Sequence, residues 1–190
     1  LERIQAQSLR MTTLVEDLLL LARLDEGQEL VHGAVDPSRL AIDAVGDAQA
    51  ADRGHSWVLD LDDSPVVIAG DAGRLSQVLG NLLANARIHT PEGTTVTVGV
   101  THDGDAAVIR VHDDGPGVDP AVAAELFERF SRGDRSRARK TGGTGLGLSI
   151  VRAIVEAHDG TSAVDSEPGA TTFTVTQPPG PVAFGTSTEQ

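Results

Sequence analysis

The sequence predicts an α+β fold, a two-layer sandwich in which helices cover one face of a sheet, preceded by one long amphipathic helix. Two observations predict this class. Helical and strand-like hydrophobic periods are mixed after Pro37, and β-branched runs come in pairs separated by short turns, which indicates antiparallel hairpins. A chain of 190 residues, of which 39% are hydrophobic, is long enough for one well-buried domain and an additional element.

The first element is a long helix. Between Leu1 and Leu24 apolar residues recur at three- and four-residue steps without glycine or proline, which predicts about six turns of amphipathic helix. A single helix cannot bury its own apolar stripe, so this one requires partner helices. Because the helical pattern is already under way at the first residue, we expect the chain to be part of a longer protein. Residues 28–35 are expected to form a linker or a short strand.

The later elements follow from changes in the hydrophobic period. Asp36 and Pro37 offer a cap and a first-turn proline for a helix, and a strongly apolar helix begins at Asp71 and stops before Pro91. Further expected helices lie near residues 120–129 and after the glycine-rich stretch as far as about His158. The expected strands are residues 57–61 and 66–69, joined by a turn at 62–65, then the hairpins 94–101 with 106–112 and 161–166 with 171–177. Residues 179–190 have no pattern and are expected to be disordered.

The composition excludes several classes of function. A formal net charge of −13 argues against a protein that neutralises nucleic-acid phosphates over a broad face, so we expect no nucleic-acid partner. The chain has no cysteine, which excludes disulfides, thiolate metal sites and cysteine nucleophiles. The apolar run near the start is too short to span a bilayer and no signal segment is visible, so we expect no direct membrane insertion by this chain.

The stretch GGTGLGLS places four glycines immediately before an apolar helix. It does not fit a P-loop, because Leu148 stands where the lysine is required, and it does not fit a dinucleotide fingerprint, which requires Gly or Ala at that same position. Glycines that allow close backbone approach, followed by a helix N-terminus, still suit a phosphate group. A phosphate loop and a plain hinge both remain open at this point.

The segment before these glycines is unusually basic. Six of the fifteen Lys and Arg residues of this acidic chain lie between Arg129 and Lys140. Runs of charge are usually solvated loops, but this one is also suited to a mobile lid whose cations close over phosphates.

Two further groups of polar residues interrupt apolar elements. Asn81 and Asn85 are four residues apart on one face of the helix that begins at Asp71, and His89 follows at the next turn. Their amides either satisfy neighbouring backbone groups or offer an oxygen to a magnesium ion that also holds phosphates. In VHDDGPGVD, Asp113 at a strand end either forms a turn or accepts a hydrogen bond from an exocyclic amine in an apolar pocket.

Four stretches carry a family resemblance. QVLGNLLANARIHT, VHDDGPGV, LFERFSRGD and GGTGLGLSIV resemble the N, G1, F and G2 boxes of bacterial sensor histidine kinases, in the same order. The resemblance implies the Bergerat (GHKL) ATP-binding fold over residues 36–178, with a lid at about 116–144. Residues 1–27 resemble the second helix of the dimerisation and phosphotransfer domain. Expected cofactors are ATP and Mg²⁺.

The resemblance also implies roles for single residues. Asn85 would be the magnesium ligand, and Asn81 and Arg132 would act in catalysis, Asn81 where related ATPases keep a glutamate that activates water. Asp113 would bind the adenine amine. Phe127 and Phe130 would anchor the lid. The expected nucleotide-binding residues are Asn81, Asn85, Arg87, His89, Asp113, Gly115, Gly117, Val118, Phe130, Lys140, Thr141, Gly143, Gly145, Leu146, Gly147, Leu148 and Thr172, with Arg129 and Arg132 as further phosphate contacts.

The sequence departs from the family pattern at several positions. Many relatives have a basic residue three positions after the magnesium asparagine; here that position is Ile88, and Arg87 is the candidate instead. Thr171 is the alternative to Thr172 for the threonine behind adenine. None of the six histidines resembles the family's phosphoacceptor, so this chain is expected to bind ATP without phosphorylating itself.

The resemblance also implies partners and a location. They are a response regulator receiver domain, a homodimer through the dimerisation helices, and a cytoplasmic location, with the full-length protein anchored in the bacterial cell membrane. The activity that the resemblance implies is transfer of the ATP γ-phosphate to a histidine of a dimerisation domain, for relay to an aspartate of the response regulator. Two alternatives to it remain: a non-catalytic nucleotide-gated interaction module, and a related ATPase or serine kinase of the same fold.

Overall fold

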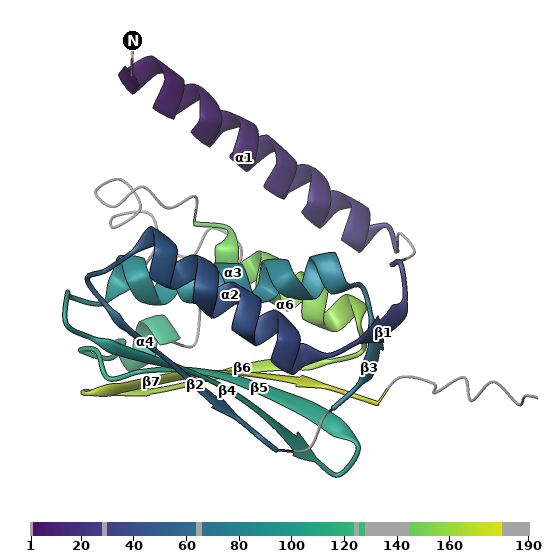
Figure 1. Ribbon diagram of the computed structural model, residues 1–190. Helices are drawn as coiled ribbons and strands as arrows, with labels where there is room; N and C mark the ends of the chain where they lie inside the picture. The colour runs from purple at the N-terminus through teal and green to yellow at the C-terminus, as the bar shows by residue number, and fades with distance from the viewer. Residues whose placement is uncertain (1, 28–29, 64–65, 124–125, 128–144, 180–190) are drawn as a thin grey trace, which may run out of the picture.

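The computed structural model describes residues 2–27, 30–63, 66–123, 126–127 and 145–179. They form two layers, a five-stranded sheet and a layer of helices on one of its faces (Figure 1). The strands are β2 (Ser56–Leu61), β4 (Thr95–Asp103), β5 (Ala106–Asp113), β6 (Thr161–Glu167) and β7 (Ala170–Gln177). The covering helices are α2 (Pro37–Ala51), α3 (Ala72–His89) and α6 (Gly147–Ala157). The expected α+β sandwich is therefore confirmed.

The sheet has the strand order β2-β4-β5-β7-β6. The two expected hairpins are present, because β4 pairs antiparallel with β5, and β6 pairs antiparallel with β7. The central pair β5–β7 is also antiparallel and aligns Asp113 with Thr171. This alignment brings the ends of two strands that are distant in sequence to one edge of the sheet.

The two strands on either side of the expected turn at 62–65 are both present, but they belong to different sheets. The strand expected at residues 57–61 does not pair with the one at 66–69. Instead, β2 joins β4 in parallel, and β3 (Ile68–Gly70) pairs antiparallel with β1 (Gly33–Val35), which lies inside the expected linker. Burial explains this second, small sheet, because Val35 and Ile68 pack with Leu75 in a separate apolar cluster.

Local capping chemistry fixes two of the helix starts. The side chain of Asp36 accepts hydrogen bonds from the backbone N–H groups of Ser38 and Arg39, and Asp71 accepts one from Arg74. The helix expected at 120–129 is shorter within the described residues, where α4 spans Pro120–Ala123. The tail beyond Pro179, expected to be disordered, lies outside the described residues.

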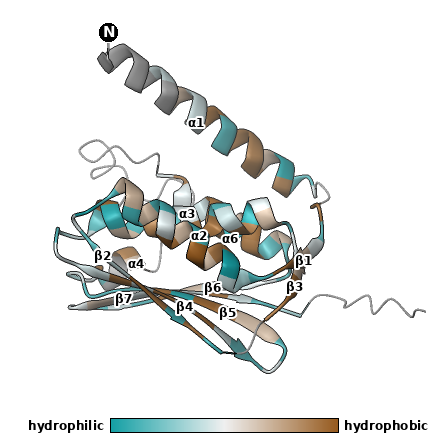
Figure 2. Cartoon of the chain, in the orientation of Figure 1, coloured by the Kyte–Doolittle hydropathy of each residue, from teal (hydrophilic) through white to brown (hydrophobic). Residues whose placement is uncertain are grey.

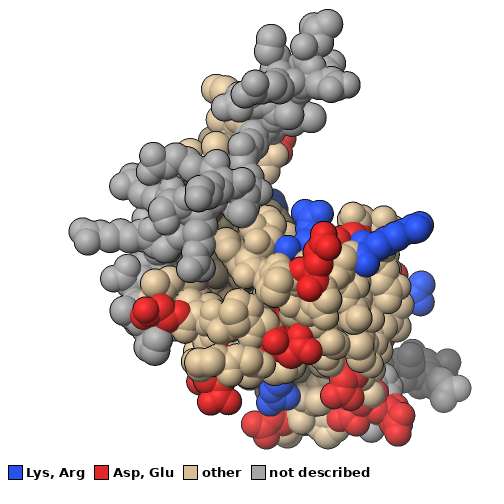
Figure 3. Space-filling view, turned by 90° about the vertical axis from the view of Figure 1, so that its left-hand side faces the viewer, with Lys and Arg blue, Asp and Glu red and all other residues tan. Residues whose placement is uncertain are grey.

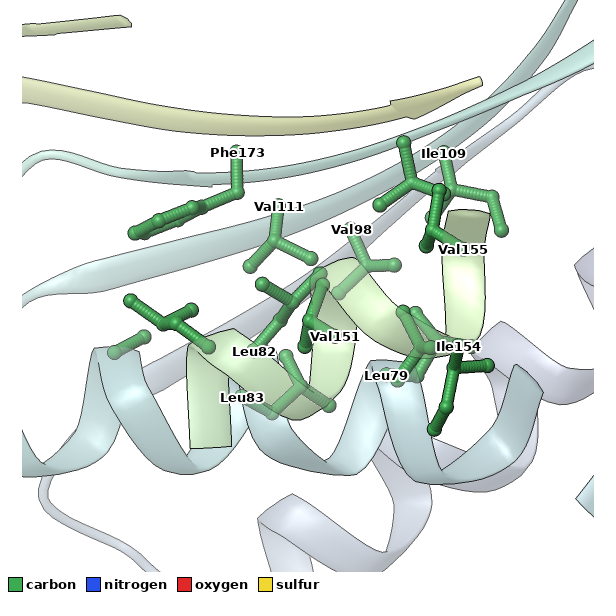
Figure 4. Packing of buried hydrophobic residues seen from close by; sticks show 14 of the residues in the cluster. Leu79, Leu82, Leu83, Val98, Ile109, Val111, Val151, Ile154, Val155 and Phe173 are labelled. Carbon is green, nitrogen blue, oxygen red and sulfur yellow. The ribbon is translucent and has the colours of Figure 1, made fainter. Parts of the chain in front are cut away.

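The main core lies between the sheet and helices α3 and α6. Hydrophobic residues gather where these helices face the strands (Figure 2). Buried side chains alternate along β4 and β7, as expected for strands with one covered face. Figure 4 shows this packing for Leu79, Leu82, Leu83, Val98, Ile109, Val111, Val151, Ile154, Val155 and Phe173.

Helix α1 (Glu2–Asp25) packs on the domain only near its C-terminal end and projects away from it at the other (Figure 1). Leu20 and Leu21 are buried, whereas Met11 and Val15 are more than half exposed. The apolar stripe is therefore only partly covered by this chain. Within the part of the chain that the structure describes, no helix has the length and apolar character to cross a membrane.

Candidate functional site

A small cavity lies where α3 ends, beside the edge of the sheet at which the end of β5 pairs with the start of β7. Its lining residues are Asn85, Ala86, His89, Thr90, Asp113, Pro116, Gly117, Val118, Thr171 and Phe173. The cavity has a volume of about 20 Å³, which is enough for a single water molecule. The cavity as it stands is too small to enclose a larger ligand.

Asp113 is the charged group of this cavity. It is the last residue of β5, and its side chain is only 4% exposed because it points toward the helical layer. Burial raises the pKa of Asp113, and a hydrogen bond of 3.1 Å from the backbone N–H of Gly115 partly opposes that rise. A buried carboxylate with a fixed orientation can accept a hydrogen bond from a donor that enters the cavity.

Two glycines keep the loop after β5 close to its neighbours. A Cβ atom on Gly115 would lie 2.6 Å from Oδ1 of Asp113 and 2.8 Å from Cγ2 of Thr90. Gly117 has a φ of +78°, and its Cβ would lie 2.4 Å from the carbonyl oxygen of Glu167. The loop therefore requires glycine at both positions.

The far wall of the cavity is held by a chain of hydroxyl contacts. The backbone N–H of Val118 donates a 2.8 Å hydrogen bond to Oγ of Ser166, which lies 3.0 Å from Oγ1 of Thr171. Thr171 is 3% exposed and lines the cavity. The loop after β5 is thus fastened to the hairpin of β6 and β7.

The polar residues of α3 divide into two groups. Asn85 and His89 line the cavity, as their four-residue spacing predicts. Asn81 lies one turn earlier, and its amide donates a 3.3 Å hydrogen bond to the carbonyl oxygen of Gly147. For Asn81, therefore, the structure favours an amide that satisfies neighbouring backbone.

The start of α6 lies beside Asn81. Gly145 has a φ of +71°, and Leu146 is fully buried, which fixes the chain as it enters the helix. The N-cap residue, Leu146, makes no side-chain hydrogen bond to the first turn, and the first N–H groups of an α-helix have no partner within the helix. Such a helix start suits an anion.

Two predicted residues do not lie at the cavity. Thr172 points to the opposite face of the sheet, where its hydroxyl lies 2.9 Å from Nδ1 of His112, because neighbouring strand residues face opposite ways. Arg87 lines a groove between α2 and α3 together with Asp47 and Trp57. It is two residues beyond Asn85, which turns it to the other side of the helix. Neither side chain lines the cavity, whereas Thr171, the alternative to Thr172, does.

The predicted lid contacts cannot be placed. Arg129, Phe130, Arg132, Lys140, Thr141 and Gly143 all lie outside the described residues. Phe127 is described and packs edge-on against Phe173, with ring centres 6.1 Å apart. Phe127 therefore contacts a core residue that also lines the cavity.

Three residues near the cavity are not among the predicted site residues. Thr90 and Pro116 line it inside stretches that resemble family boxes, although neither is assigned a role, and Ser166 fastens it from outside any pattern that indicates a site. Phe173 could have been found from strand alternation, since it faces the same side as Thr171.

The oxygen donors of the cavity are few. The described residues contain no group of three or more His, Asp or Glu side chains that could hold a metal ion. A divalent cation there would have to depend on the amide oxygen of Asn85 together with ligand oxygens and water, which is the coordination that Mg²⁺ accepts.

The comparison with protein families decides the assignment. Residues 70–181 match the model of histidine kinase-, DNA gyrase B- and HSP90-like ATPases. The chain belongs to this ATPase family. The matched residues include α3, the loop after β5 and β7, which are the elements that line the cavity.

Relatives place the ATPase domain among the sensor kinases. The probable sensor histidine kinase TcrY of Mycobacterium tuberculosis is 56% identical over 178 residues, covering 94% of this chain and 38% of that protein. The Acinetobacter baumannii histidine kinase AdeS superposes with a TM-score of 0.75 at 25% identity, covering 93% of this chain and 82% of that one. Full-length ShkA, in complex with AMPPNP, superposes with a TM-score of 0.76 at 31% identity, covering 88% and 35%.

The family match and these relatives together show which type of domain the chain is. It is an ATP-binding catalytic domain of the sensor histidine kinase type. The chain spans less than half of the length of the curated relatives given first, TcrY and the sensor histidine kinase TrcS.

Proposed function

We propose that this domain binds ATP at the Asp113 cavity and transfers the γ-phosphate to a histidine of a dimerisation domain. The phosphate would then pass to an aspartate of a response regulator receiver domain. The observation that carries the proposal is the buried carboxylate of Asp113, oriented by Gly115 in a cavity that Asn85 also lines. A buried charged group of this kind costs stability, which is consistent with a role in binding.

The base of the nucleotide would lie against Asp113. Its carboxylate would accept a hydrogen bond from the exocyclic amine of adenine, while Val118 and Phe173 would contact the ring. Thr171 would lie behind the ring. Since the cavity of about 20 Å³ is too small for a purine, it would have to widen on binding.

The phosphates would lie between α3 and the start of α6. The amide oxygen of Asn85 would hold the magnesium ion, whose charge offsets that of the phosphate oxygens. The uncapped N–H groups at Gly147 and Leu148 would face the phosphates. The basic residues of the segment 129–140 would close over them, as the resemblance implies.

The phosphoacceptor would be supplied by another segment or protein. A nitrogen of its imidazole would attack the γ-phosphorus in line, the bond from that phosphorus to the bridging oxygen would break, and ADP would leave. The histidines His55, His112 and His158 of this chain are instead hydrogen-bonded within the fold. Asn81 would not activate water, because an amide is no base and its N–H group is directed at Gly147.

The dimerisation helices are the proposed route to a homodimer. Along α1 the side chains of Met11, Val15 and Leu18 are exposed, and an apolar stripe of this kind suits a partner helix. Membrane anchoring, which the resemblance implies for the full-length protein, would reside in a part outside this chain.

Transfer of labelled phosphate tests the proposal. The chain is mixed with a histidine-bearing dimerisation domain and ATP labelled at the γ-phosphate, and label on the added domain is expected only with magnesium. Asn85→Ala should abolish transfer, whereas Gln77→Ala on the same helix, whose amide accepts from Arg74, should retain it. Release of free phosphate without transfer would favour a related ATPase, and nucleotide binding with neither activity would favour a nucleotide-gated module.

A further inference from the structure

A buried histidine lies behind the cavity without entering it. The side chain of His55, in the loop between α2 and β2, is only 4% exposed. Its Nδ1 atom is hydrogen-bonded to Oδ2 of Asp52, and its Nε2 atom lies 3.0 Å from Oγ1 of Thr90. The ring therefore connects the end of α2 to the end of α3.

Asp52, which is hydrogen-bonded to His55, is itself held by two further hydrogen bonds. The other carboxylate oxygen of Asp52 accepts a 3.0 Å hydrogen bond from the backbone N–H of Gly54, and Nε1 of Trp57 donates to the backbone carbonyl of Asp52 at 3.3 Å. The Gly54 bond and the neighbouring His55 lower the pKa of Asp52. The carboxylate thus stays ionised and fixes the orientation of the ring.

Thr90 contacts His55 and also lines the cavity. It is the C-cap residue of α3, and its hydroxyl donates a 2.8 Å hydrogen bond to the carbonyl oxygen of Ala86. Its methyl group faces Gly115, where any Cβ would come within 2.8 Å of it. Gly115 in turn holds the carboxylate of Asp113 through its N–H group.

We propose that His55 is a positioning residue for base selection: by fixing Thr90 against Gly115, it holds the carboxylate of Asp113 where it accepts from an amine of the base. The inference rests on the proposed nucleotide site. A guanine presents a carbonyl oxygen where adenine presents its amine, and a fixed carboxylate repels that oxygen. A carboxylate that can shift discriminates less between the two bases.

The test compares two nucleotides. Non-hydrolysable analogues of ATP and GTP are titrated calorimetrically, with magnesium, into the wild type, His55→Ala and Thr90→Val. Valine keeps the branched shape of threonine and removes the hydroxyl that bonds His55. Each variant is expected to bind the ATP analogue about fivefold more weakly, with little change for the GTP analogue, so the selectivity ratio falls by a similar factor.

Two controls separate positioning from stability. His102→Ala removes an exposed histidine–aspartate pair with Asp62 at the end of the β4–β5 ladder opposite to Asp113, and it should change neither affinity. The double variant of His55 and Thr90 should be no weaker than either single variant, because both remove the same contact. A purely structural role would lower the melting temperature and weaken both analogues equally.

The outcomes are distinguishable. If the wild type binds neither analogue, the proposed function fails. If the wild type binds the ATP analogue and Thr90→Val keeps the full selectivity ratio, the positioning role of His55 is overturned while the proposed function stands. Thr90→Val decides the question even if His55→Ala does not fold.

Discussion

The side-chain amide of Asn81 donates a hydrogen bond to the backbone carbonyl of Gly147, across 66 residues of sequence. This bond joins the middle of α3 to the first turn of α6 and so places the start of α6 one helical turn from Asn85. The relative position of the proposed magnesium ligand and the proposed phosphate-binding N–H groups therefore depends on Asn81.

Replacement of Asn81 should reveal this role. Asn81→Asp replaces the donor with a carboxylate that faces the carbonyl oxygen of Gly147, so the domain should lose about 1–3 kcal/mol of unfolding free energy. Asn81→Ala, which leaves the carbonyl without a repelling neighbour, should lose less. Urea unfolding at neutral pH measures both. Equal stability of the two variants would contradict the bond.

The buried charge of Asp113 should lower the stability of the domain at neutral pH and strengthen nucleotide binding. Because burial raises the pKa of Asp113, its carboxyl group binds a proton more tightly in the folded state than in the unfolded state. The stability of the wild type therefore falls as the pH rises from the unfolded-state pKa to the folded-state pKa of this group. Asp113→Asn lacks this loss, so it should be more stable than the wild type at neutral pH. Below the ordinary carboxyl pKa of about 3.9, the two proteins should be equally stable.

The same substitution should weaken binding of an ATP analogue by about tenfold, since it replaces a charged acceptor with a neutral amide, whose hydrogen bonds are weaker. Denaturation at a series of pH values, with calorimetry at neutral pH, checks both halves. A variant that is less stable at neutral pH would contradict the account of the buried charge.

Thr171 and Thr172 form a matched pair. Thr171→Val removes a hydroxyl that lines the cavity and contacts Ser166, so the affinity for the ATP analogue should fall by about threefold to tenfold. Thr172→Val removes a hydroxyl from the outer face, beside His112, and should leave the affinity unchanged. Titration of both variants checks which of the two threonines contributes to nucleotide binding. The reverse order of effects would favour Thr172.

Gly117→Ala should destabilise the loop in two ways. Its φ of +78° costs an alanine about 1–2 kcal/mol, and the new Cβ would collide with the carbonyl oxygen of Glu167. Gly169→Ala is the control, because Gly169 has a φ of +94° with nothing within 4 Å of the new Cβ. Thermal unfolding of both variants isolates the collision, and an equal loss in the two would argue against it.

The sequence predicts those parts of the fold that depend on neighbouring residues. Asp36 and Asp71 cap helices through hydrogen bonds within three residues, and turn residues between β-branched runs specify the hairpins. The pairing of β1 with β3 and of β2 with β4 depends on contacts between distant segments, which no local period encodes.

The site residues also divide into those that local spacing predicts and those that depend on contacts between distant segments. Asn85 and His89 share a helical face, so their spacing predicts that they line one cavity, whereas Arg87 departs from that face by the same helical geometry. The contact of His55 with Thr90 spans 35 residues and joins two loops, so no sequence pattern indicates it. The role of the basic segment 129–140 as a lid over the phosphates stays a prediction, because this segment lies outside the described residues.

Magnesium-dependent binding of an ATP analogue tests the central claim most directly. The wild type is titrated calorimetrically with the analogue, with and without Mg²⁺, beside Asn85→Ala and Asp113→Ala. The account predicts one site that requires magnesium for full affinity, loss of the magnesium dependence in Asn85→Ala, and loss of most of the affinity in Asp113→Ala. Binding that is unchanged in both variants would contradict the assignment of this cavity.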